Sequence, residues 1–325
     1  MMSWPEKRVL VTGGAGFIGH RLVTKLADLG AHVAVVDDLS KGTMKNLEGL
    51  LGRIRLSNDD LLEPGVAKRL VRDVDVCFHM AARIGGIGYF HKSPATSLRD
   101  NSIMNFNLWD AAVGTDTKMV CLSSSMVFER TSLFPTPENA LQHSPPPLTG
   151  YGFSKLVAEY IARTYHEQLG IKYLIVRPFN AYGPGETPGE YVGYAHVIPD
   201  LIKKSLSGEY PLEILGSGEQ SRSYTYVDDV ADAIVYVTER CENDDFNIGS
   251  GVETSVLELA ERIWLLCGRK EPFKVNKLTS LKYDVQKRVP DISKIRHLGW
   301  APRVSLDEGL GLTVEWISSQ LRGAS

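Results

Sequence analysis

The residues with the clearest capacity for chemistry are a tyrosine and a lysine four positions apart. Tyr151 and Lys155 belong to the segment Tyr-Gly-Phe-Ser-Lys at the start of an expected helix, where side chains four apart share one face. A neighbouring ammonium favours tyrosinate and so lowers the pKa of the phenol from about 10 toward neutrality. We therefore predict that Tyr151 is a general base, although the spacing by itself is also common by chance.

A run of hydroxyl side chains, Ser123 to Ser125, ends an apolar stretch upstream of this pair. In a doubly wound parallel sheet, a hydroxyl at the carboxyl end of a strand points into the crevice that binds ligands. Ser124 is then placed to share a substrate proton with Tyr151. The alternative interpretation is that these serines only cap the end of the strand.

Distant segments must come together to place these groups, and the hydrophobic pattern predicts a sheet that does so. Short β-branched runs alternate with longer helical patterns. Continuous apolar runs between helices are typical of a parallel sheet covered on both faces. Strands are expected at residues 8–12, 33–37, 74–80, 118–123 and 173–177, and helices at 17–29, 102–113 and 153–169.

A glycine-rich loop directly follows the first expected strand and opens the first helix. Gly13, Gly16 and Gly19 fit the spacing GxxGxxG. These glycines permit a tight turn, a close approach of the backbone to a pyrophosphate, and close packing of helix on strand. The helix N-terminus, with Phe17 and Ile18, then faces the phosphates. The alternative is a glycine turn that only connects strand and helix.

An acidic residue at the end of the second strand indicates the cofactor. Asp37 can accept hydrogen bonds from the adenosine ribose hydroxyls, which favours NAD over NADP, and Lys155 can hold the nicotinamide ribose. Lys41 lies nearby, so NADP stays open, and Asp37 as a merely solvated acid is the other interpretation. The fold class that follows is α/β: a Rossmann-type doubly wound parallel sheet with a smaller mixed α/β C-terminal substrate lobe.

The amino-acid composition of the chain changes near Asn180, where glycine, proline and tyrosine become frequent. The tail is mostly helical, with a proline-rich break near Pro290. We expect the NAD-binding unit to comprise residues 1–180 plus about 223–248. The smaller substrate-binding lobe is expected at residues 181–222 plus 249–325.

Composition excludes several classes of function. The 325 residues include 36 basic and 39 acidic ones, a net charge of −3, so a global basic field for nucleic acid is absent. No apolar run approaches the roughly 18 residues of a membrane span, and no signal peptide precedes the first strand, so we expect a cytoplasmic protein. The four cysteines form no CxxC pair and are expected to be buried free thiols. The histidines lack HExxH or HxxxH spacing, so no metal site is predicted.

Together these motifs resemble the extended short-chain dehydrogenase/reductase family, the nucleotide-sugar epimerases and dehydratases, over essentially the whole chain. The resemblance implies NAD as cofactor and a nucleotide-diphosphate sugar as substrate. It also implies a homodimer through a four-helix bundle that the helices at 102–113 and 153–168 would supply. The matching stretches are TGGAGFIG (12–19), VVDDLS (35–40), HMAA (79–82), YGFSK (151–155), RPFNAYGPG (177–185), SYTYVDD (223–229) and NIGSG (247–251).

The resemblance also assigns residues to each ligand. Arg222 and Arg288 would reach the substrate diphosphate, since arginine makes charge-assisted, often bidentate bonds to phosphates; each is otherwise a solvated surface residue. The implied catalytic residues are Ser124, Tyr151 and Lys155. The implied cofactor contacts are Gly13, Gly16, Phe17, Ile18, Gly19, Asp37, Asp60, Leu61, Ala81, Ala82, Arg83, Asn101, Tyr151, Lys155 and Pro178. The implied substrate contacts are Gly86, Ser124, Ser125, Met126, Tyr151, Asn180, His196, Val197, Arg222 and Arg288.

The two positions after Ser124 favour one reaction within the family. Dehydratases carry an Asp-Glu pair there, whereas this chain has Ser125 and Met126. The 3,5-epimerases and the GDP-fucose-synthase type carry a cysteine at the second position, and the thioether of Met126 has no exchangeable proton. A C4 epimerase needs neither the Asp-Glu pair nor the cysteine, because it oxidises C4, lets the keto-sugar rotate and returns the hydride to the other face. We therefore expect NAD-dependent C4 epimerisation.

Two features favour a different branch. The segments GGIGY (85–89) and LGWAP (298–302) look like GDP-mannose 3,5-epimerases. His196 aligns with the second acid/base of the GDP-fucose-synthase type and titrates in a suitable range, but as a substrate hydrogen bonder or a loop residue it fits equally. The alternative function is therefore a GDP-sugar 3,5-epimerase or a 4-keto-sugar reductase, and the base, uridine or guanosine, stays open. A non-catalytic NAD-sensing module is a third hypothesis.

Overall fold

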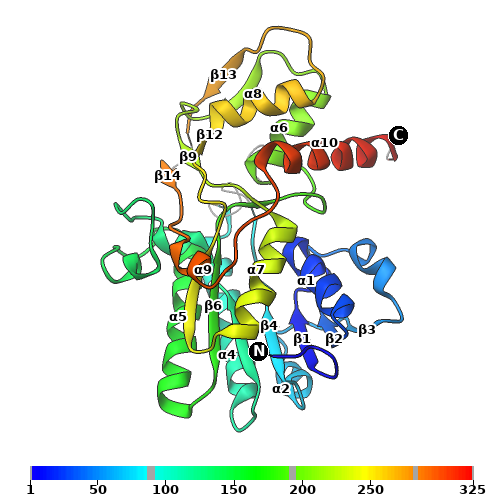
Figure 1. Ribbon diagram of the computed structural model, residues 1–325, viewed down its shortest axis with the longest axis vertical. Coiled ribbons are helices and arrows are strands. Elements are labelled where there is room, and N and C mark those ends of the chain that lie inside the picture. Colours follow the sequence, from blue (N-terminus) through cyan, green and yellow to red (C-terminus); the bar gives the residue numbers. More distant parts are fainter. Residues whose placement is uncertain (1, 86–91, 190–194, 281–284, 324–325) are drawn as a thin grey trace.

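A seven-stranded sheet lies at the centre of the computed structural model, which describes residues 2–85, 92–189, 195–280 and 285–323 (Figure 1). The order is β11-β6-β5-β4-β1-β2-β3, and every neighbouring pair is parallel. This confirms the expected doubly wound α/β fold. The order reverses between β1 and β4, and such a switch point creates the ligand crevice of these sheets. The strands are β1 (Arg8–Thr12), β2 (His32–Val36), β3 (Ile54–Ser57), β4 (Val76–His79), β5 (Lys118–Leu122), β6 (Tyr173–Pro178) and β11 (Asp244–Ile248).

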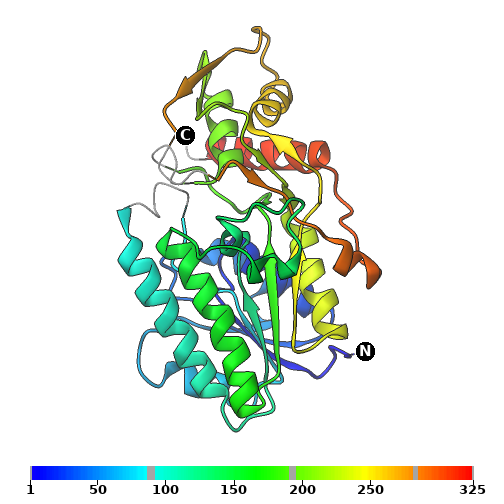
Figure 2. The ribbon, with the colours of Figure 1, turned by 90° about the vertical axis from the view of Figure 1, so that its left-hand side faces the viewer.

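Helices cover both faces of this sheet (Figures 1 and 2). On one face α1 (Phe17–Asp28) packs beside α7 (Val227–Arg240), and on the other lie α2 (Val66–Val71), α4 (Pro94–Ala112) and α5 (Gly150–Leu169). Val9 and Val11 of β1 contribute to one hydrophobic core and Leu10 to the other, because successive strand residues point to opposite faces. Burial on both faces explains the continuous apolar runs in the sequence.

The smaller lobe has its own hydrophobic core, which includes Ile202, Leu212, Trp264 and Leu310. It is built from α6 (Val197–Leu206), α8 (Val256–Leu266) and α10 (Leu306–Gly323) with the parallel pair β8 (Leu212–Leu215) and β13 (Val275–Leu278). Short strands join the two parts of the chain: β7 (Ala181–Tyr182), β9 (Ser221–Arg222), β10 (Thr225–Tyr226), β12 (Thr254–Ser255) and β14 (Lys287–Arg288). Short 3-10 helices lie at η1 (Met44–Leu50), η2 (Ser125–Phe128) and η3 (Glu138–Gln142).

The chain crosses between the two parts more than once. After the first crossing, α7 and β11 return to the central sheet. Further on, α9 (Ser293–His297) lies against β11, and Ile292, Ile295 and Trp300 pack into the core of the sheet. The segment around α9 therefore differs from the sequence-based division, which placed all of residues 249–325 in the smaller lobe.

Several element boundaries differ from the sequence-based prediction for local reasons. The helix α5, which bears Tyr151 and Lys155, begins at Gly150 rather than 153, because the Thr149 hydroxyl caps it by accepting a hydrogen bond from the Gly152 amide at 3.0 Å. Of the four cysteines, all free, Cys77 and Cys121 are buried as expected, but Cys241 and Cys267 are only partly buried. Among the described residues, the structure contains no helix with the length and hydropathy that crossing a bilayer requires.

Candidate active site

One cavity, of about 1130 Å³, opens between the carboxyl edge of the sheet and the smaller lobe. Among the residues predicted to contact cofactor or substrate, Asn101 does not line this cavity, and Gly86 lies outside the described residues. The structure brings the others together around it: Gly13, Gly16, Phe17, Ile18, Gly19, Asp37, Asp60, Leu61, Ala81, Ala82, Arg83, Ser124, Ser125, Met126, Tyr151, Lys155, Pro178, Asn180, His196, Val197, Arg222 and Arg288.

The glycine loop has the shape of a pyrophosphate cradle. Gly13 has φ +66°, a left-handed conformation, and a Cβ there would lie 2.7 Å from the backbone of Ala81. A Cβ at Gly19 would lie 2.1 Å from the Gly13 carbonyl oxygen, so the helix can start this close to the loop only with glycine. The N-terminus of α1 adds its partial positive charge. The residues present thus fit a dinucleotide.

Asp37 joins the glycine loop to the end of β2. One carboxylate oxygen accepts a hydrogen bond from the Ala15 amide and the other from the Leu39 amide, each at 2.9 Å. Burial raises the pKa of Asp37, and these two hydrogen bonds oppose the rise. The carboxylate therefore stabilises the cradle as well as lining the cavity, and each oxygen retains a lone pair for a ribose hydroxyl.

Arg83 lies at the centre of a group of carboxylates from distant segments. Its guanidinium contacts Asp38 at 2.7 Å, Asp60 at 3.5 Å and Asp100 at 3.7 Å. Asn101 holds the Arg83 backbone, with its side-chain oxygen accepting from the Arg83 amide at 2.7 Å, and donates to Ser154 at 3.1 Å. Asn101 therefore lies behind Arg83 and does not line the cavity, unlike the other described residues that were predicted to contact the cofactor.

The three residues predicted to perform the chemistry meet at one end of the cavity. Ser124 is hydrogen-bonded to Tyr151 and caps η2 by accepting from the Met126 amide at 3.2 Å. The Lys155 ammonium lies 5.8 Å from the centre of the Tyr151 ring and donates to the Leu122 carbonyl at 2.7 Å. Strand β5 thus fixes both the serine and the direction of the lysine.

The pKa of Tyr151 differs from the expectation based on the Tyr-x-x-x-Lys spacing. Burial raises it to about 12, and the hydrogen bond from Ser124 and the charge of Arg288 only moderate the rise. Lys155 is not among the groups that lower the pKa of Tyr151; its own burial lowers the lysine pKa to about 8, and its ammonium donates to the Leu122 carbonyl. In the absence of ligands the phenol therefore keeps its proton at neutral pH.

The opposite wall carries the groups expected to hold a diphosphate. Asn180 has φ +39° and donates to the Ser223 carbonyl at 2.9 Å, while Arg288 donates to the Asn180 side-chain oxygen at 3.4 Å. Arg222 is buried and donates to the Ser221 carbonyl at 2.9 Å. Both side chains line the cavity, and a guanidinium makes charge-assisted hydrogen bonds to phosphate oxygens.

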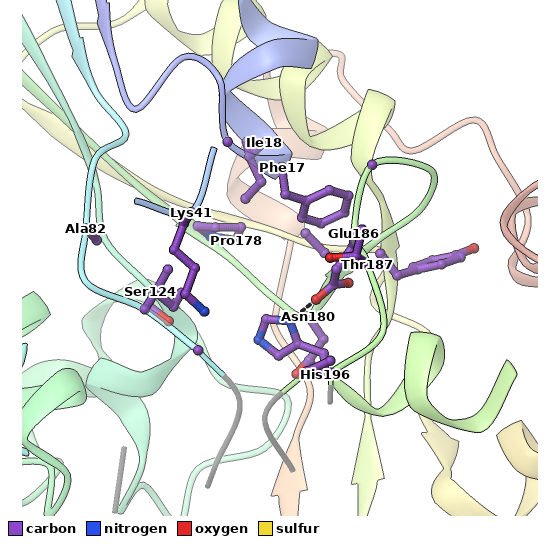
Figure 3. A pocket seen from close by; sticks show the side chains of 18 of the residues that line it. Phe17, Ile18, Lys41, Ala82, Ser124, Pro178, Asn180, Glu186, Thr187 and His196 are labelled. Carbon is purple, nitrogen blue, oxygen red and sulfur yellow. Dashed lines mark hydrogen bonds and ion pairs between the residues drawn. The ribbon is translucent and has the colours of Figure 1, made fainter. Parts of the chain in front are cut away.

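The structure adds a carboxylate, Glu186, that the sequence analysis did not single out. It pairs with His196, and Figure 3 shows both across the cavity from Ser124 and Lys41. The charge of Glu186 raises the pKa of His196, and the cations Arg288 and Lys41 oppose the rise. The only signal in the sequence was its position directly after Tyr-Gly-Pro-Gly. An acid/base pair thus faces the cavity, although the histidine is ten residues away along the chain.

His79, at the end of β4, is a buried neutral imidazole beside this site. The Thr12 hydroxyl accepts a hydrogen bond from the Ala81 amide at 3.1 Å and bonds to His79 Nδ1 at 2.8 Å. Burial, and then the charge of Lys155, lower the pKa of His79 to about 3. These hydrogen bonds tie the ends of β1 and β4 together at the cofactor crevice.

The protein should lose stability on acidification because of His79. Below pH 6.5 the unfolded chain takes up a proton that the folded protein does not take up until about pH 3. The free energy of unfolding should fall in this window by about 1.4 kcal/mol per pH unit from this residue. Denaturant titrations at pH 7.5 and 5 measure the fall, and His79→Asn, whose side-chain oxygen can replace Nδ1, should reduce it. An equal fall in both proteins would contradict the assignment.

This fold and the glycine cradle define a class: α/β proteins that bind a dinucleotide at the carboxyl edge of a doubly wound parallel sheet. The chain belongs to the NAD dependent epimerase/dehydratase family, whose family model matches residues 9–249. NAD is accordingly the cofactor, and the enzyme is one of the nucleotide-sugar epimerase/dehydratase type.

Relatives within the family have different reactions. The chain is 32% identical to UDP-glucuronic acid decarboxylase 1 of Xenopus tropicalis, over 97% of this chain and 73% of that protein. It is also 32% identical to a putative UDP-glucose 4-epimerase of Methanocaldococcus jannaschii, over 97% of this chain and 99% of that one. Among solved structures, the UDP-glucose 4-epimerase of Thermotoga maritima with UDP-glucose has 34% identity and a TM-score of 0.87, covering 97% and 99% of the two chains.

Proposed function

We propose that this protein epimerises a nucleotide-diphosphate sugar at C4 through a transient 4-keto intermediate, with NAD regenerated in every turnover. The observation that supports this most directly is the Ser124–Tyr151 hydrogen bond in the cavity, next to a position occupied by Met126. The pair can take up and return a hydroxyl proton, while the methionine offers no second acid or base.

Each residue then has a defined part. Tyr151 removes the proton from the C4 hydroxyl, and Ser124 shares it through their hydrogen bond. Arg222 and Arg288 bind the diphosphate, leaving the sugar free to present either face. NAD in the glycine cradle supplies a hydride acceptor and a positive charge. Lys155 orients it from its place beside Leu122.

The wall beside the phenol favours a neutral sugar. Met126 and Tyr151 pack together in a small apolar cluster, and Ile84 packs against them. Dehydration needs an acid next to the leaving hydroxyl, and this cluster supplies none. A carboxylate at C6 of the sugar would lose hydration against this apolar cluster without a compensating contact from Met126 or Ile84.

Decarboxylation is the second candidate, because several of the relatives carry that name. It shares the opening step: oxidation at C4 of a hexuronic acid gives a β-keto acid, which loses CO₂ and takes up a proton at C5. The apolar Met126 side of the cavity argues against a charged sugar there. The test must nevertheless include a hexuronic acid.

The test is an NMR assay of the purified protein in deuterated water without added reductant. Parallel reactions contain UDP-, GDP- and dTDP-hexoses and UDP-glucuronic acid. A C4 stereoisomer without deuterium on carbon is the expected result, because the hydride returns internally, and it also identifies the nucleotide base.

The other outcomes overturn the proposal in distinguishable ways. Deuterium at C3 or C5 establishes a 3,5-epimerase and makes the Glu186–His196 pair its acid/base group. In a further reaction, reduction of an added nucleotide-linked 4-keto-sugar with stoichiometric oxidation of NADH or NADPH establishes a 4-keto-sugar reductase. A UDP-pentose with release of CO₂ establishes a decarboxylase.

We also propose that two copies associate through α4 and α5, which lie side by side on the outside of the sheet (Figure 2). Large apolar side chains are exposed there: Ile103 and Phe106 on α4, and Phe153 and Tyr160 on α5. Phe106 is 44% and Tyr160 61% exposed, in the positions that a second pair of helices would cover in a four-helix bundle.

Phe106→Glu should halve the mass in solution, measured by light scattering, because two buried carboxylates would face each other across the dimer axis. Leu265→Glu is the matched control, since Leu265 is 66% exposed on α8 and lies outside the proposed interface. A wild-type protein that is already monomeric, or a Phe106→Glu protein with unchanged mass, would contradict the dimer.

A further inference from the structure

A buried ionic network lies directly behind the catalytic residues. The Arg177 guanidinium forms two parallel hydrogen bonds to the Glu159 carboxylate, each at 2.7 Å, and both side chains are 0% exposed. The same carboxylate accepts a hydrogen bond from the Ser123 hydroxyl at 2.5 Å. Ser123 directly precedes Ser124, so the network touches the serine-bearing end of β5 itself.

The network also reaches the other catalytic residues through the helix. Glu159 lies one turn after Lys155 and two turns after Tyr151 on α5, so all three share one helix face. Arg177 lies on β6, and the Ser123 amide donates to the neighbouring Val176 carbonyl at 2.9 Å. The two segments that carry the reacting hydroxyls therefore converge on one carboxylate and its arginine.

Further charged and aromatic side chains surround the Arg177–Glu159 ion pair. Arg177 contacts Asp245 of β11 at 2.5 Å, Arg163 contacts Glu159 at 3.1 Å, and the Phe128 ring lies 5.2 Å from the guanidinium carbon of Arg177. Two carboxylates thus face two guanidiniums. Burial raises the pKa of Glu159, but the charge and hydrogen bonds of Arg177 outweigh it and leave that pKa below its usual range.

Stability alone does not account for this arrangement. Replacing a buried ion pair by well-packed apolar residues is often neutral or stabilising. A hydrogen bond from Ser123 to the pair does something that apolar packing cannot: it fixes the serine-bearing strand end against the helix that bears Tyr151. The Ser124–Tyr151 hydrogen bond depends on that relative position of the strand end and the helix. A displacement of about 1 Å near a reacting group can lower a rate about 10²-fold.

We infer that Glu159, held by Arg177 and bonded to Ser123, is a positioning residue that sets the Ser124–Tyr151 hydrogen bond used in the reaction. This rests on the proposed roles of Ser124 and Tyr151, but not on which carbon of the sugar is finally altered. The expected consequence is that weakening the network raises the pKa of Tyr151, because the bond from Ser124 is one of the contacts that lowers it.

The first test uses Ser123→Ala in the NAD-bound protein. This change removes one hydrogen bond and leaves the ion pair intact. Ultraviolet difference titration against Tyr151→Phe isolates the ionisation of Tyr151 and needs no substrate. Its apparent pKa should rise by about 0.5–1 pH unit, the equivalent of one lost hydrogen bond. An unchanged Tyr151 titration overturns the inference, whatever reaction the enzyme performs.

The second test measures the kinetics with the sugar that the NMR assay identifies. In Ser123→Ala, kcat should fall about 10–100-fold with the KM of the nucleotide sugar unchanged, and the basic limb of the pH profile should move upward. Thr313→Val is the control, because it removes an equally buried hydroxyl hydrogen bond on α10, between Thr313 and Gly309, neither of which lines the cavity. A fall in thermal stability with kcat and pH profile unchanged would assign Ser123 a purely structural role.

A double variant, Glu159→Met with Arg177→Met, separates charge from packing. It removes both buried charges together and so avoids leaving one unpaired. The expected protein is folded by circular dichroism, binds NAD, and shows the raised Tyr151 pKa and the lowered kcat of Ser123→Ala. Wild-type kcat in this folded variant would overturn the inference.

Discussion

Tyr151→Phe should lower the rate of cofactor reduction by a nucleotide sugar about 10²–10⁴-fold, the usual contribution of a positioned acid–base group. The phenol is hydrogen-bonded to Ser124 and packs against Met126, whose thioether has no exchangeable proton with which to replace it. The phenylalanine ring keeps that packing, since only the hydroxyl is lost from a side chain that is 4% exposed. NAD affinity should therefore stay near its wild-type value.

The measurement is a single turnover in a rapid-mixing instrument, following the absorbance of reduced nicotinamide. Ser124→Ala is the companion variant: it should slow the step by less, because the phenol remains.

The rate of cofactor reduction should also depend on pH in a defined direction. Burial holds the pKa of Tyr151 at about 12 before ligands bind, so the rate should rise with pH until the tyrosine of the complex ionises. A Tyr151→Phe protein with wild-type rates would remove Tyr151 as the base.

Gly19→Ala should weaken NAD binding about 100-fold, the second largest effect that we expect. The new methyl group would lie 2.1 Å from the Gly13 carbonyl oxygen and 2.9 Å from the Gly14 Cα, both backbone atoms of the cradle. The loop can relieve this contact only by moving away from α1, which takes its amides away from the pyrophosphate. The melting temperature should fall as well, because the loop also packs on Ala81.

Gly49→Ala provides the control for the Gly19 variant. A Cβ at Gly49 would meet no atom of the described residues within 4 Å, and its φ is outside the left-handed region. NAD affinity, measured by calorimetric titration, should be unchanged there. Equal affinities for Gly19→Ala and wild type would show that the cradle is not the pyrophosphate site.

Helix α5, which bears Tyr151 and Lys155, has one property that could be predicted from the sequence and one that could not. The spacing of Tyr151 and Lys155 predicted that both face one way, and they do, since helical periodicity is a local property. The prediction that this spacing lowers the pKa of Tyr151 was wrong. The pKa of Tyr151 depends on how completely the lobes and β5 bury the phenol, and the direction of Lys155 depends on the Leu122 carbonyl of another segment.

The pairings that the sequence analysis missed share one property: the partners are remote along the chain. Arg83, expected near the cofactor, contacts Asp38, Asp60 and Asp100 only because the ends of β2 and β3 and the first turns of α4 lie together. Glu159 meets Arg177 only when α5 packs on β6. Neither pairing has a spacing that could be recognised in the sequence.

The sequence by itself determined the glycine cradle after β1, the alternation of strands and helices, the Tyr151–Lys155 face and, through its motifs, the family. These depend on backbone conformation and on periodicities of two and 3.6 residues, which neighbouring residues fix. Only the tertiary structure decided the protonation of Tyr151 and His79, the place of Asn101 behind the cavity wall, and the Glu159 network behind Ser124. Those properties depend on burial and on charges that the fold brings together, and neither can be predicted from the spacing of residues in the sequence.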